Sequence, residues 1–228
     1  MKPSLSVIIP VLHEAGNINS LLDHVALQAG PSALEVIVAD GADEKDTLAA
    51  IRRDSVIPVS SSPGRGKQMN AGAAAAQGDI LLFLHADTRL PEGGLADVER
   101  IMAGNAYVGG AFDLGIDSKH WFLKMTQHVG TLRSRLTRVP YGDQAIFIRR
   151  SFFESIGGYR ELPLMEDVDL MRRIKRAGGR ICFIPKRVST SARRWEKDGA
   201  IRGTLRNWVL ISLYLLGVPP ERLVKFYK

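Results

Sequence analysis

The sequence has almost no cysteine. Cys182 is the single cysteine among 228 residues, so no disulfide can form within the chain. Such usage is typical of a reducing compartment, which favours a cytoplasmic protein. Cys182 lies in an apolar segment, residues 180–184, that predicts a buried strand. A core residue is therefore a better interpretation of this cysteine than a nucleophile.

Long apolar runs are also missing. Residues 208–218 form the longest late run, broken only by Ser212, and fall well short of the ~20 residues that cross a bilayer. Near the start, Pro10, His13 and Glu14 interrupt the first apolar run too early for a signal peptide. Residues 208–216 are apolar nearly all round, which leaves burial, a homodimer contact and a peripheral contact at the inner face of the membrane as open alternatives.

Acidic charge is scarce in the last quarter of the chain. From Met171 onward there are 15 Lys or Arg and only 3 Asp or Glu, whereas the whole chain has a net charge of +7. The preceding residues are therefore net acidic. This asymmetry favours an anionic partner, such as a nucleotide diphosphate or a phospholipid surface, although a solvated basic face is the simpler interpretation. Nothing beyond charge points to nucleic acid, and we expect no nucleic-acid partner.

What the chain does contain is an alternation of strand and helix patterns typical of an α/β fold. Apolar runs without alternation at residues 5–11, 35–40, 56–60 and 80–84 predict strands covered on both faces, as in a mostly parallel sheet. Further strands are expected at 109–114 and 145–149. Helical periodicity or helix-start signals predict helices at 17–29, 43–53 (capped by Asp43), 67–76, 91–104, 119–138, from 164 onward, and at 199–216.

The loops lack the standard phosphate-binding fingerprints. Residues 11–16, after the first strand, do not have the glycine spacing of a NAD-type fold. Residues 61–68 fail the P-loop pattern because Ser61 and Gln68 stand where glycine and Ser or Thr are required. Arg65 and Lys67 nevertheless bring two cations beside a helix start, which suits a phosphate group.

Carboxylates follow two of the predicted strands. Asp87 comes after the strand at 80–84, with His85 two residues before it, and Asp40 ends the strand at 35–40. Ligands of open α/β sheets bind beyond the carboxyl ends of strands. Asp87 could hold a divalent cation against a diphosphate, and Asp40 could accept hydrogen bonds from a nucleobase or ribose. Both could equally be turn residues.

Two later motifs also have both a structural and a functional interpretation. Glu166 and Asp167 open a predicted helix, where acids are favourable with the helix dipole. The same position could place a general base at the mouth of a cleft. Arg193 or Arg194 could clamp a diphosphate, because a guanidinium group matches phosphate oxygens in a bidentate way.

Together these stretches resemble the family-2 glycosyltransferases of the GT-A fold, over nearly the whole chain. Residues 6–14 look like the family's first strand and nucleotide loop, and residues 36–43 like its second strand. His85-Ala86-Asp87 occupies the place of the metal-binding Asp-X-Asp, and Glu166-Asp167 is similar to the Glu-Asp motif that carries the catalytic base. Residues 141–144 and 191–195 further resemble a compact bacterial subgroup linked with arsenosugar biosynthesis.

The resemblance implies one GT-A domain over residues 1–228, with a nucleotide-sugar-binding half (1–115) and an acceptor-binding and C-terminal helical half (116–228). It implies an inverting, metal-assisted transfer of sugar from a nucleotide-diphosphate sugar, with a UDP-sugar favoured, to an unknown acceptor hydroxyl. Asp87 would bind Mn²⁺ or Mg²⁺, and Asp167, beside Glu166, would take the proton. The donor would be held by Pro10, Glu14, Asp40, Arg65, Lys67, His85 and Arg194, and the acceptor by Asp143, Gln144 and Trp195.

The chain departs from the family pattern at two places. His85 replaces the first acid of Asp-X-Asp, and imidazole suits Mn²⁺ better than Mg²⁺. The Gln-X-X-Arg-Trp motif of processive members is present only as residues 191–195, so polymer synthesis is not expected. Two alternatives stay open: a sugar-phosphate nucleotidyltransferase, whose pyrophosphate loop residues 64–67 faintly resemble, and a non-enzymatic module that binds anions or membranes.

Overall fold

A seven-stranded sheet forms the centre of the computed structural model, which describes residues 4–30 and 34–227. Its strand order is β3-β2-β1-β4-β8-β6-β9, and only β8 runs antiparallel to its neighbours β4 and β6. The predicted mostly parallel α/β sheet is therefore confirmed. The strands are β1 (Leu5–Val11), β2 (Leu34–Asp40), β3 (Val56–Ser60), β4 (Ile80–Phe83), β6 (Gly109–Asp113), β8 (Phe147–Arg149) and β9 (Ile181–Arg187).

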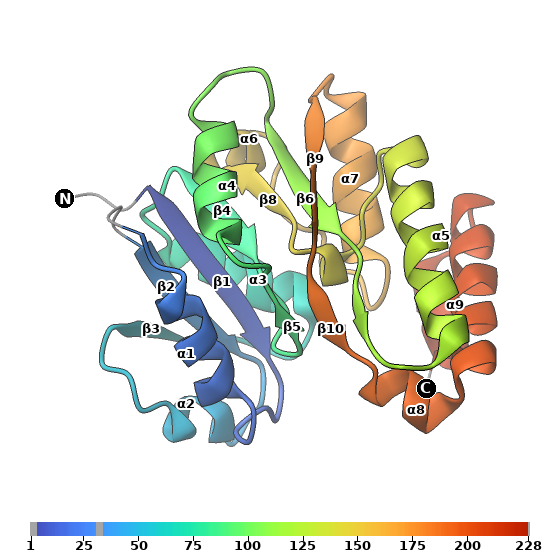
Figure 1. Ribbon diagram of the computed structural model, residues 1–228, viewed down its shortest axis with the longest axis horizontal. Coiled ribbons are helices and arrows are strands. Elements are labelled where there is room, and N and C mark those ends of the chain that lie inside the picture. The colour runs from blue at the N-terminus through green and yellow to red at the C-terminus, as the bar shows by residue number, and fades with distance from the viewer. Residues whose placement is uncertain (1–3, 31–33, 228) are drawn as a thin grey trace.

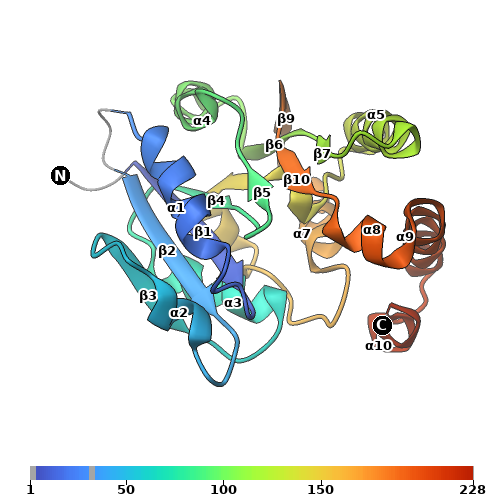
Figure 2. The ribbon, with the colours of Figure 1, turned by 60° about the horizontal axis from the view of Figure 1, so that its bottom comes forward.

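Helices cover both faces of this sheet. On one face lie α1 (Ile18–Leu27) and α4 (Gly94–Met102); on the other lie α3 (Arg65–Ala75), α6 (Arg150–Ser155) and α7 (Glu166–Arg176) (Figures 1 and 2). Consecutive residues of β1 enter different cores, since Val7 and Ile9 pack with α1 whereas Ile8 packs with α3. This two-sided burial explains why the strands have continuous apolar runs instead of alternation.

The register of the first strands gathers their ends at one edge of the sheet. Val11 of β1 lies opposite Asp40 of β2, and Asp40 lies opposite Ser60 of β3. Phe83, the last residue of β4, pairs with Ile8. The polar segment that follows β4 therefore leaves the sheet at the edge where ligands of such folds bind.

A second, small sheet was not anticipated. Its strands β5 (Thr88–Arg89), β7 (Ile116–Asp117) and β10 (Ser189–Ser191) run in the order β5-β10-β7. Thr88 and Thr190 are joined by a buried hydroxyl–hydroxyl hydrogen bond of 3.1 Å. The small sheet thus ties the segment after β4 to the segment after β9.

One helix is shorter than its pattern predicts. The expected helix at 43–53 is α2 (Asp46–Ala50), and Asp43 does not cap it. Instead Lys45 precedes the helix in a left-handed conformation, with φ of 51°. The chain reaches helical geometry later because residues 41–45 form the turn that follows β2.

The C-terminal part of the chain, from residue 116 onward, contributes further helices and turns. It contains α5 (Trp121–Thr137), the 3-10 turn η1 (Gly142–Gln144), α8 (Arg193–Asp198), α9 (Ala200–Leu215), α10 (Pro220–Leu223) and η2 (Val224–Phe226). Helices α5 and α9 lie side by side at one end of the molecule, far from the first strands (Figures 1 and 2). A separate apolar cluster contains Val168 of α7, Leu210 of α9 and Leu223 of α10. Within the described residues, no helix is both long and apolar enough to cross a membrane.

Candidate active site

A cleft lies where the segment after β4, η1, the start of α7 and the inner side of α9 meet. It contains about 860 Å³ of empty space, part of which is open to solvent. Residues far apart in the sequence converge on it because α7 and α9 pack against each other beside the sheet edge. Of the residues predicted from sequence, those that line it are Arg65, His85, Asp87, Asp143, Glu166, Asp167 and Trp195.

The carboxylate of Asp167 is fixed by two backbone N–H groups. Its Oδ1 accepts from Val168 N at 2.7 Å, and its Oδ2 accepts from Gly142 N at 2.6 Å. Met165, with φ of 69°, turns the chain so that α7 begins at Glu166 and Asp167 stands in its first turn. A non-glycine residue in this region is uncommon and is found disproportionately at functional sites. The sequence therefore holds one carboxylate rigidly between α7 and η1.

Gly142 brings His85 into the same place. A Cβ atom on Gly142 would lie 2.7 Å from both Cε1 and Nε2 of His85, and 3.6 Å from Oδ2 of Asp167. Real side chains do not tolerate the shorter distance, so the imidazole packs directly on a backbone that only glycine provides. The predicted donor residue His85 and the predicted base Asp167 thus both approach the same glycine.

Glu166 connects the two sides of the cleft. It is buried, and burial first, then the charge of Asp167, raise the pKa of its carboxyl to about 7, while Arg65 opposes the shift. Oε1 of Glu166 lies 3.8 Å from Nη1 of Arg65, the first residue of α3. The predicted cation of the donor loop is therefore held at the cleft by a buried acid of α7.

Asp143 carries an unpartnered oxygen. Its Oδ1 is buried and, among the described residues, has no hydrogen-bond partner. Burial first, and then the charge of Asp167, raise the pKa of the Asp143 carboxyl to about 7, while Arg133 opposes the shift. A buried polar atom without a partner costs free energy that folding alone does not return. Asp143 is thus suited to meet a polar group of a ligand.

Asn207 of α9 is a second polar group of this kind, and it was not selected from the sequence. It lines the cleft, and its Oδ1 is also buried without a hydrogen-bond partner in the described structure. Its position as the polar residue directly before the apolar run at 208–218 was the available signal. The two unpartnered oxygens of Asp143 and Asn207 both belong to the half of the cleft formed by the C-terminal part.

Aromatic and apolar side chains complete that half. Tyr141 lines the cleft, and the guanidinium carbon of Arg133, from α5, lies 3.3 Å from the centre of its ring. Such a contact is a cation–π interaction that fixes the ring. Arg133 was not selected from the sequence either. Further lining side chains on this side are Leu164, Trp195, Leu210, Ile211 and Tyr227.

The donor set at Asp87 fits a shared ion better than a self-sufficient metal centre. Among the described residues, no three His, Cys, Asp or Glu side chains are grouped so that they could hold a metal ion. Asp87 is exposed at the cleft, and its Oδ1 accepts a hydrogen bond from Thr88 at 3.3 Å. Hard divalent cations are commonly held by one or two carboxylates together with substrate phosphates. Asp87 fits that arrangement.

Gln144, which was predicted to contact an acceptor, does not line the cleft. Its side chain is buried, and its Oε1 accepts from Ser134 Oγ at 2.6 Å and from Tyr141 N at 3.1 Å. Its Nε2 donates to the carbonyl of Phe112 at 2.9 Å. These three hydrogen bonds are directed inward, so Gln144 fixes η1 against β6 and α5.

Asp40, which was predicted to accept hydrogen bonds from a nucleobase or ribose, is also turned inward. It is fully buried, with Oδ1 accepting from Ala42 N at 2.8 Å and Oδ2 accepting from Leu48 N at 3.3 Å. The carboxylate thereby shapes the loop between β2 and α2. Pro10 is likewise buried within β1, opposite Ala39, and does not line the cleft.

Two further predicted donor residues lie outside the cleft. Glu14 accepts from Asn17 Nδ2 at 2.6 Å, and its Oε2 is 3.5 Å from Nη2 of Arg193 in α8. Lys67 forms an exposed ion pair with Glu161, at 3.8 Å. The Glu14–Arg193 pair joins the loop after β1 to the C-terminal part of the chain. The side chain of Arg194, which was also predicted to bind the donor, lies outside the described residues.

Comparison with known proteins gives one family match. The model of the family described as "Glycosyl transferase family 2" matches residues 6–160. An uncharacterized protein of Mycobacterium tuberculosis (strain CDC 1551 / Oshkosh) is 27% identical over 218 residues, which span 82% of this chain and 66% of that protein. Glucosyl-3-phosphoglycerate synthase of the same strain is 29% identical over 93 residues, spanning 37% of this chain and 29% of the synthase. The chain thus spans less than two thirds of these relatives.

Solved structures share the fold. A mannosyltransferase of Pyrobaculum calidifontis, PcManGT, in complex with GDP-Man and Mn²⁺, superposes with a TM-score of 0.67 and 22% identity, covering 92% of this chain and 63% of that one. Residues 1–349 of S. aureus TarS, in complex with UDP-GlcNAc, superpose with a TM-score of 0.65 and 18% identity, covering 84% of this chain and 58% of that one. At these identities the likeness establishes the architecture.

Proposed function

This chain belongs to glycosyl transferase family 2 and has the GT-A fold, and we propose that it moves a sugar from a nucleotide-diphosphate sugar to an acceptor hydroxyl with inversion at the anomeric carbon. The observation that carries the proposal is the setting of Asp167. Two backbone N–H groups fix its carboxylate in the cleft. His85 and Asp87, which we assign to the donor, line the same cleft as Asp143 and Asn207, each of which has a buried oxygen without a hydrogen-bond partner in the described structure.

The reaction needs one base and one leaving group. The acceptor hydroxyl oxygen forms a bond to the anomeric carbon while the bond from that carbon to the diphosphate breaks, and the nucleoside diphosphate leaves with the electron pair. Asp167 takes the hydroxyl proton. Asp143 and Asn207 hold the acceptor by hydrogen bonds to polar groups next to that hydroxyl. Because both oxygens are already buried, they lose little hydration when the acceptor arrives.

The donor half would hold the diphosphate. Arg65 reaches the cleft and is kept there by Glu166, and a guanidinium group suits phosphate oxygens. Asp87, with His85 beside it, would hold Mn²⁺ or Mg²⁺, and a bound ion would supply charge neutralisation for the leaving diphosphate. The complexes of the structural relatives with GDP-Man and UDP-GlcNAc support a nucleotide sugar as donor. A UDP-sugar and a GDP-sugar are the first two donors to test.

Replacement of the base tests the proposal. Asp167→Asn should keep the binding of the nucleotide sugar and slow the release of nucleoside diphosphate about 10²- to 10⁴-fold, the range for a general base. The release of nucleoside diphosphate should be measured with mixtures of candidate acceptors and with water as the acceptor. Asp97→Asn is the matched control, since Asp97 stands in the first turn of α4 and does not line the cleft.

Two results would contradict this function. If the Asp167→Asn protein releases nucleoside diphosphate at the parental rate, Asp167 is not the general base. Release of pyrophosphate from a sugar phosphate and a nucleoside triphosphate would favour a nucleotidyltransferase instead.

A further inference from the structure

Exposed apolar side chains are concentrated on two helices. The described structure has fourteen large apolar side chains that are substantially exposed, and eleven of them lie on α5, on α9 or directly after α9. Scattered exposed apolar residues need no explanation, but a gathering of this kind marks an interaction surface. The eleven are Trp121, Met125, Val129, Leu132, Leu136, Ile201, Leu205, Trp208, Val209, Leu215 and Leu216.

On each helix these side chains form a stripe that faces away from the core. On α5 they recur every three or four residues from Trp121 to Leu136, which places them on one side of the helix. The side opposite carries the buried residues Leu123, Gln127 and Ser134. A surface helix with one buried face normally has a polar outer face. Helix α5 instead has an apolar outer stripe.

Helix α9 repeats this arrangement. Its outer residues Ile201, Leu205 and Trp208 are 53%, 50% and 43% exposed, whereas Leu210 is buried against α7 and α10. Helices α5 and α9 contact each other and lie side by side at one end of the molecule (Figures 1 and 2). We call the outer stripes of the two helices together the α5–α9 face.

The charge of the two helices selects among the partners that could cover this face. Neither helix contains Asp or Glu, and together they carry five cations. Three of the five already have a partner, because Arg133 stacks on Tyr141, Arg135 pairs with Asp113 at 2.9 Å, and Arg206 lies over the ring of Tyr227. The other two, Lys124 and Arg202, are exposed.

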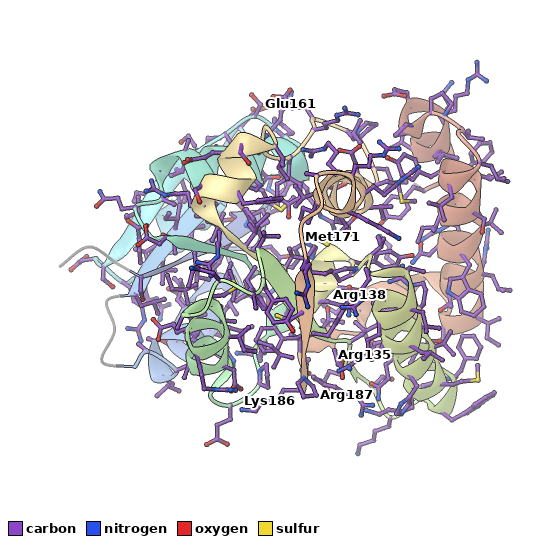
Figure 3. The ribbon with its side chains drawn as sticks, turned by 90° about the horizontal axis from the view of Figure 1, so that it is seen from above. Arg135, Arg138, Glu161, Met171, Lys186 and Arg187 are labelled. Carbon is purple, nitrogen blue, oxygen red and sulfur yellow. The ribbon has the colours of Figure 1, made fainter. Side chains whose placement is uncertain are left out.

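Two more cations, Arg138 and Arg187, lie close to α5. Figure 3 shows them with Arg135 where α5 approaches β9. Arg187 lies within 3.0 Å of His128 of α5, and Arg138 donates to the carbonyl of Ile181. A second copy of this chain would bring like charges against one another across a shared face, which is unfavourable. An anionic lipid surface offers the opposite charge and takes up apolar side chains.

We propose that the α5–α9 face docks on an anionic lipid surface. The apolar stripes enter the boundary between headgroups and acyl chains, and Lys124 and Arg202 lie at the headgroups. Because the inner side of α9 carries Asn207 to the cleft, docking places that half of the cleft next to the lipid. The docking itself does not depend on sugar transfer, so it can be tested separately from the proposed function.

Vesicle sedimentation is the experiment. The chain should co-sediment with vesicles in which half of the lipid is phosphatidylglycerol, bind phosphatidylcholine vesicles much more weakly, and lose binding as salt is added. The double variant Leu132→Ser/Leu136→Ser should reduce the partition about tenfold or more, because two exposed leucines no longer enter the lipid. Lys124→Glu/Arg202→Glu should abolish the preference for the anionic vesicles.

The controls separate docking from damage to the fold. Leu132 and Leu136 are 59% and 74% exposed, so the thermal midpoint of the double variant should match the parent. Leu12→Ser/Leu27→Ser removes two leucines that are 49% and 87% exposed in the N-terminal half, and it should leave vesicle binding unchanged.

Three results would overturn the proposal. The first is no sedimentation with anionic vesicles. The second is an equal loss of binding in the control pair. The third is a dimer in light scattering that the Leu132→Ser/Leu136→Ser variant converts to monomer without any vesicle binding, which would assign the face to a second copy of the chain.

Discussion

Two acidic side chains, one in each half of the chain, are treated in opposite ways by the fold. Asp40, in the N-terminal half, has no exposed surface, and each of its carboxylate oxygens accepts a backbone N–H. Asp143, in the C-terminal half, is half-buried; it has one buried oxygen without a hydrogen-bond partner in the described structure, and its pKa is raised to about 7. A partnered carboxylate stabilises a loop, whereas an unpartnered one reduces stability and is retained for another reason. The hydrogen bonding of the two carboxylates therefore distinguishes a residue that stabilises the fold, Asp40, from one that is available to a ligand, Asp143.

Removal of Asp40 should have the largest effect on stability. Asp40→Ala leaves the N–H groups of Ala42 and Leu48 without their acceptor inside the protein, which should lower the free energy of unfolding by about 3 kcal/mol. Urea unfolding measures the change. Asp43→Ala, in the same loop but exposed, is the control and should cost less than about 0.5 kcal/mol. If the two variants lowered the free energy of unfolding equally, the structural role of Asp40 would be contradicted.

Gly142, which both His85 and Asp167 approach, should be the next most sensitive position. In Gly142→Ala the new methyl group would meet the His85 ring at 2.7 Å. We expect a loss of stability of about 1–3 kcal/mol from overpacking and a fall of roughly 10²-fold in nucleoside diphosphate release from misplacement of the two side chains.

Gly104→Ala is the matched control for this variant, because nothing lies within 4 Å of a Cβ atom there. It should leave release unchanged. If both variants release nucleoside diphosphate at the parental rate, the close packing of His85 on η1 has no part in the reaction.

Removal of the Asp143 charge should have the smallest effect, and of opposite sign to that of Asp40. The folded pKa of Asp143 is about 7, above its ordinary value of 3.8, so the folded state holds the proton more tightly than the unfolded state. This contribution to stability is complete below the unfolded pKa and is lost as the pH rises through about 7. Asp143→Asn should therefore stabilise the metal-free protein by about 1–2 kcal/mol near pH 8, and by less near pH 5.

Thermal unfolding at the two pH values measures this difference. Asp117→Asn, at an exposed acid of β7, should show no such pH dependence. If Asp143→Asn destabilises the protein at both pH values, Asp143 is partnered like Asp40 and the comparison fails.

The same contrast explains how much the sequence could predict. Strands β1, β2 and β4 were found because both of their faces are buried, which produces continuous apolar runs. Strands β5, β7 and β10 have only two or three residues each, too few for any pattern. Their pairing depends on the segments after β4 and β9 meeting in space, which no local signal records.

Residues that line the cleft were predicted where residue type and position along the chain are enough to identify them. They were missed where the orientation of a side chain decides whether it reaches the cleft. Glu166 and Asp167 follow from an acidic helix start, and the structure places both in the cleft. Gln144 has the same kind of side chain as a ligand-binding residue, but contacts with Ser134 and Phe112 turn it inward. Asn207 faces the cleft because of the way α9 packs, which sequence alone does not give.

The most direct test of the central claim is a thermal-shift titration of the parent, Asp87→Ala and Asp167→Asn with nucleotide sugars, with and without Mn²⁺. We expect one nucleotide sugar to stabilise the parent and Asp167→Asn by about 2.7 kcal/mol when its concentration is a hundredfold above Kd. This stabilisation should depend on Mn²⁺. Asp87→Ala should lose the dependence on Mn²⁺. No shift with any UDP- or GDP-sugar at millimolar concentration, or a shift that Asp87→Ala leaves intact, would contradict a metal-assisted donor site in this cleft.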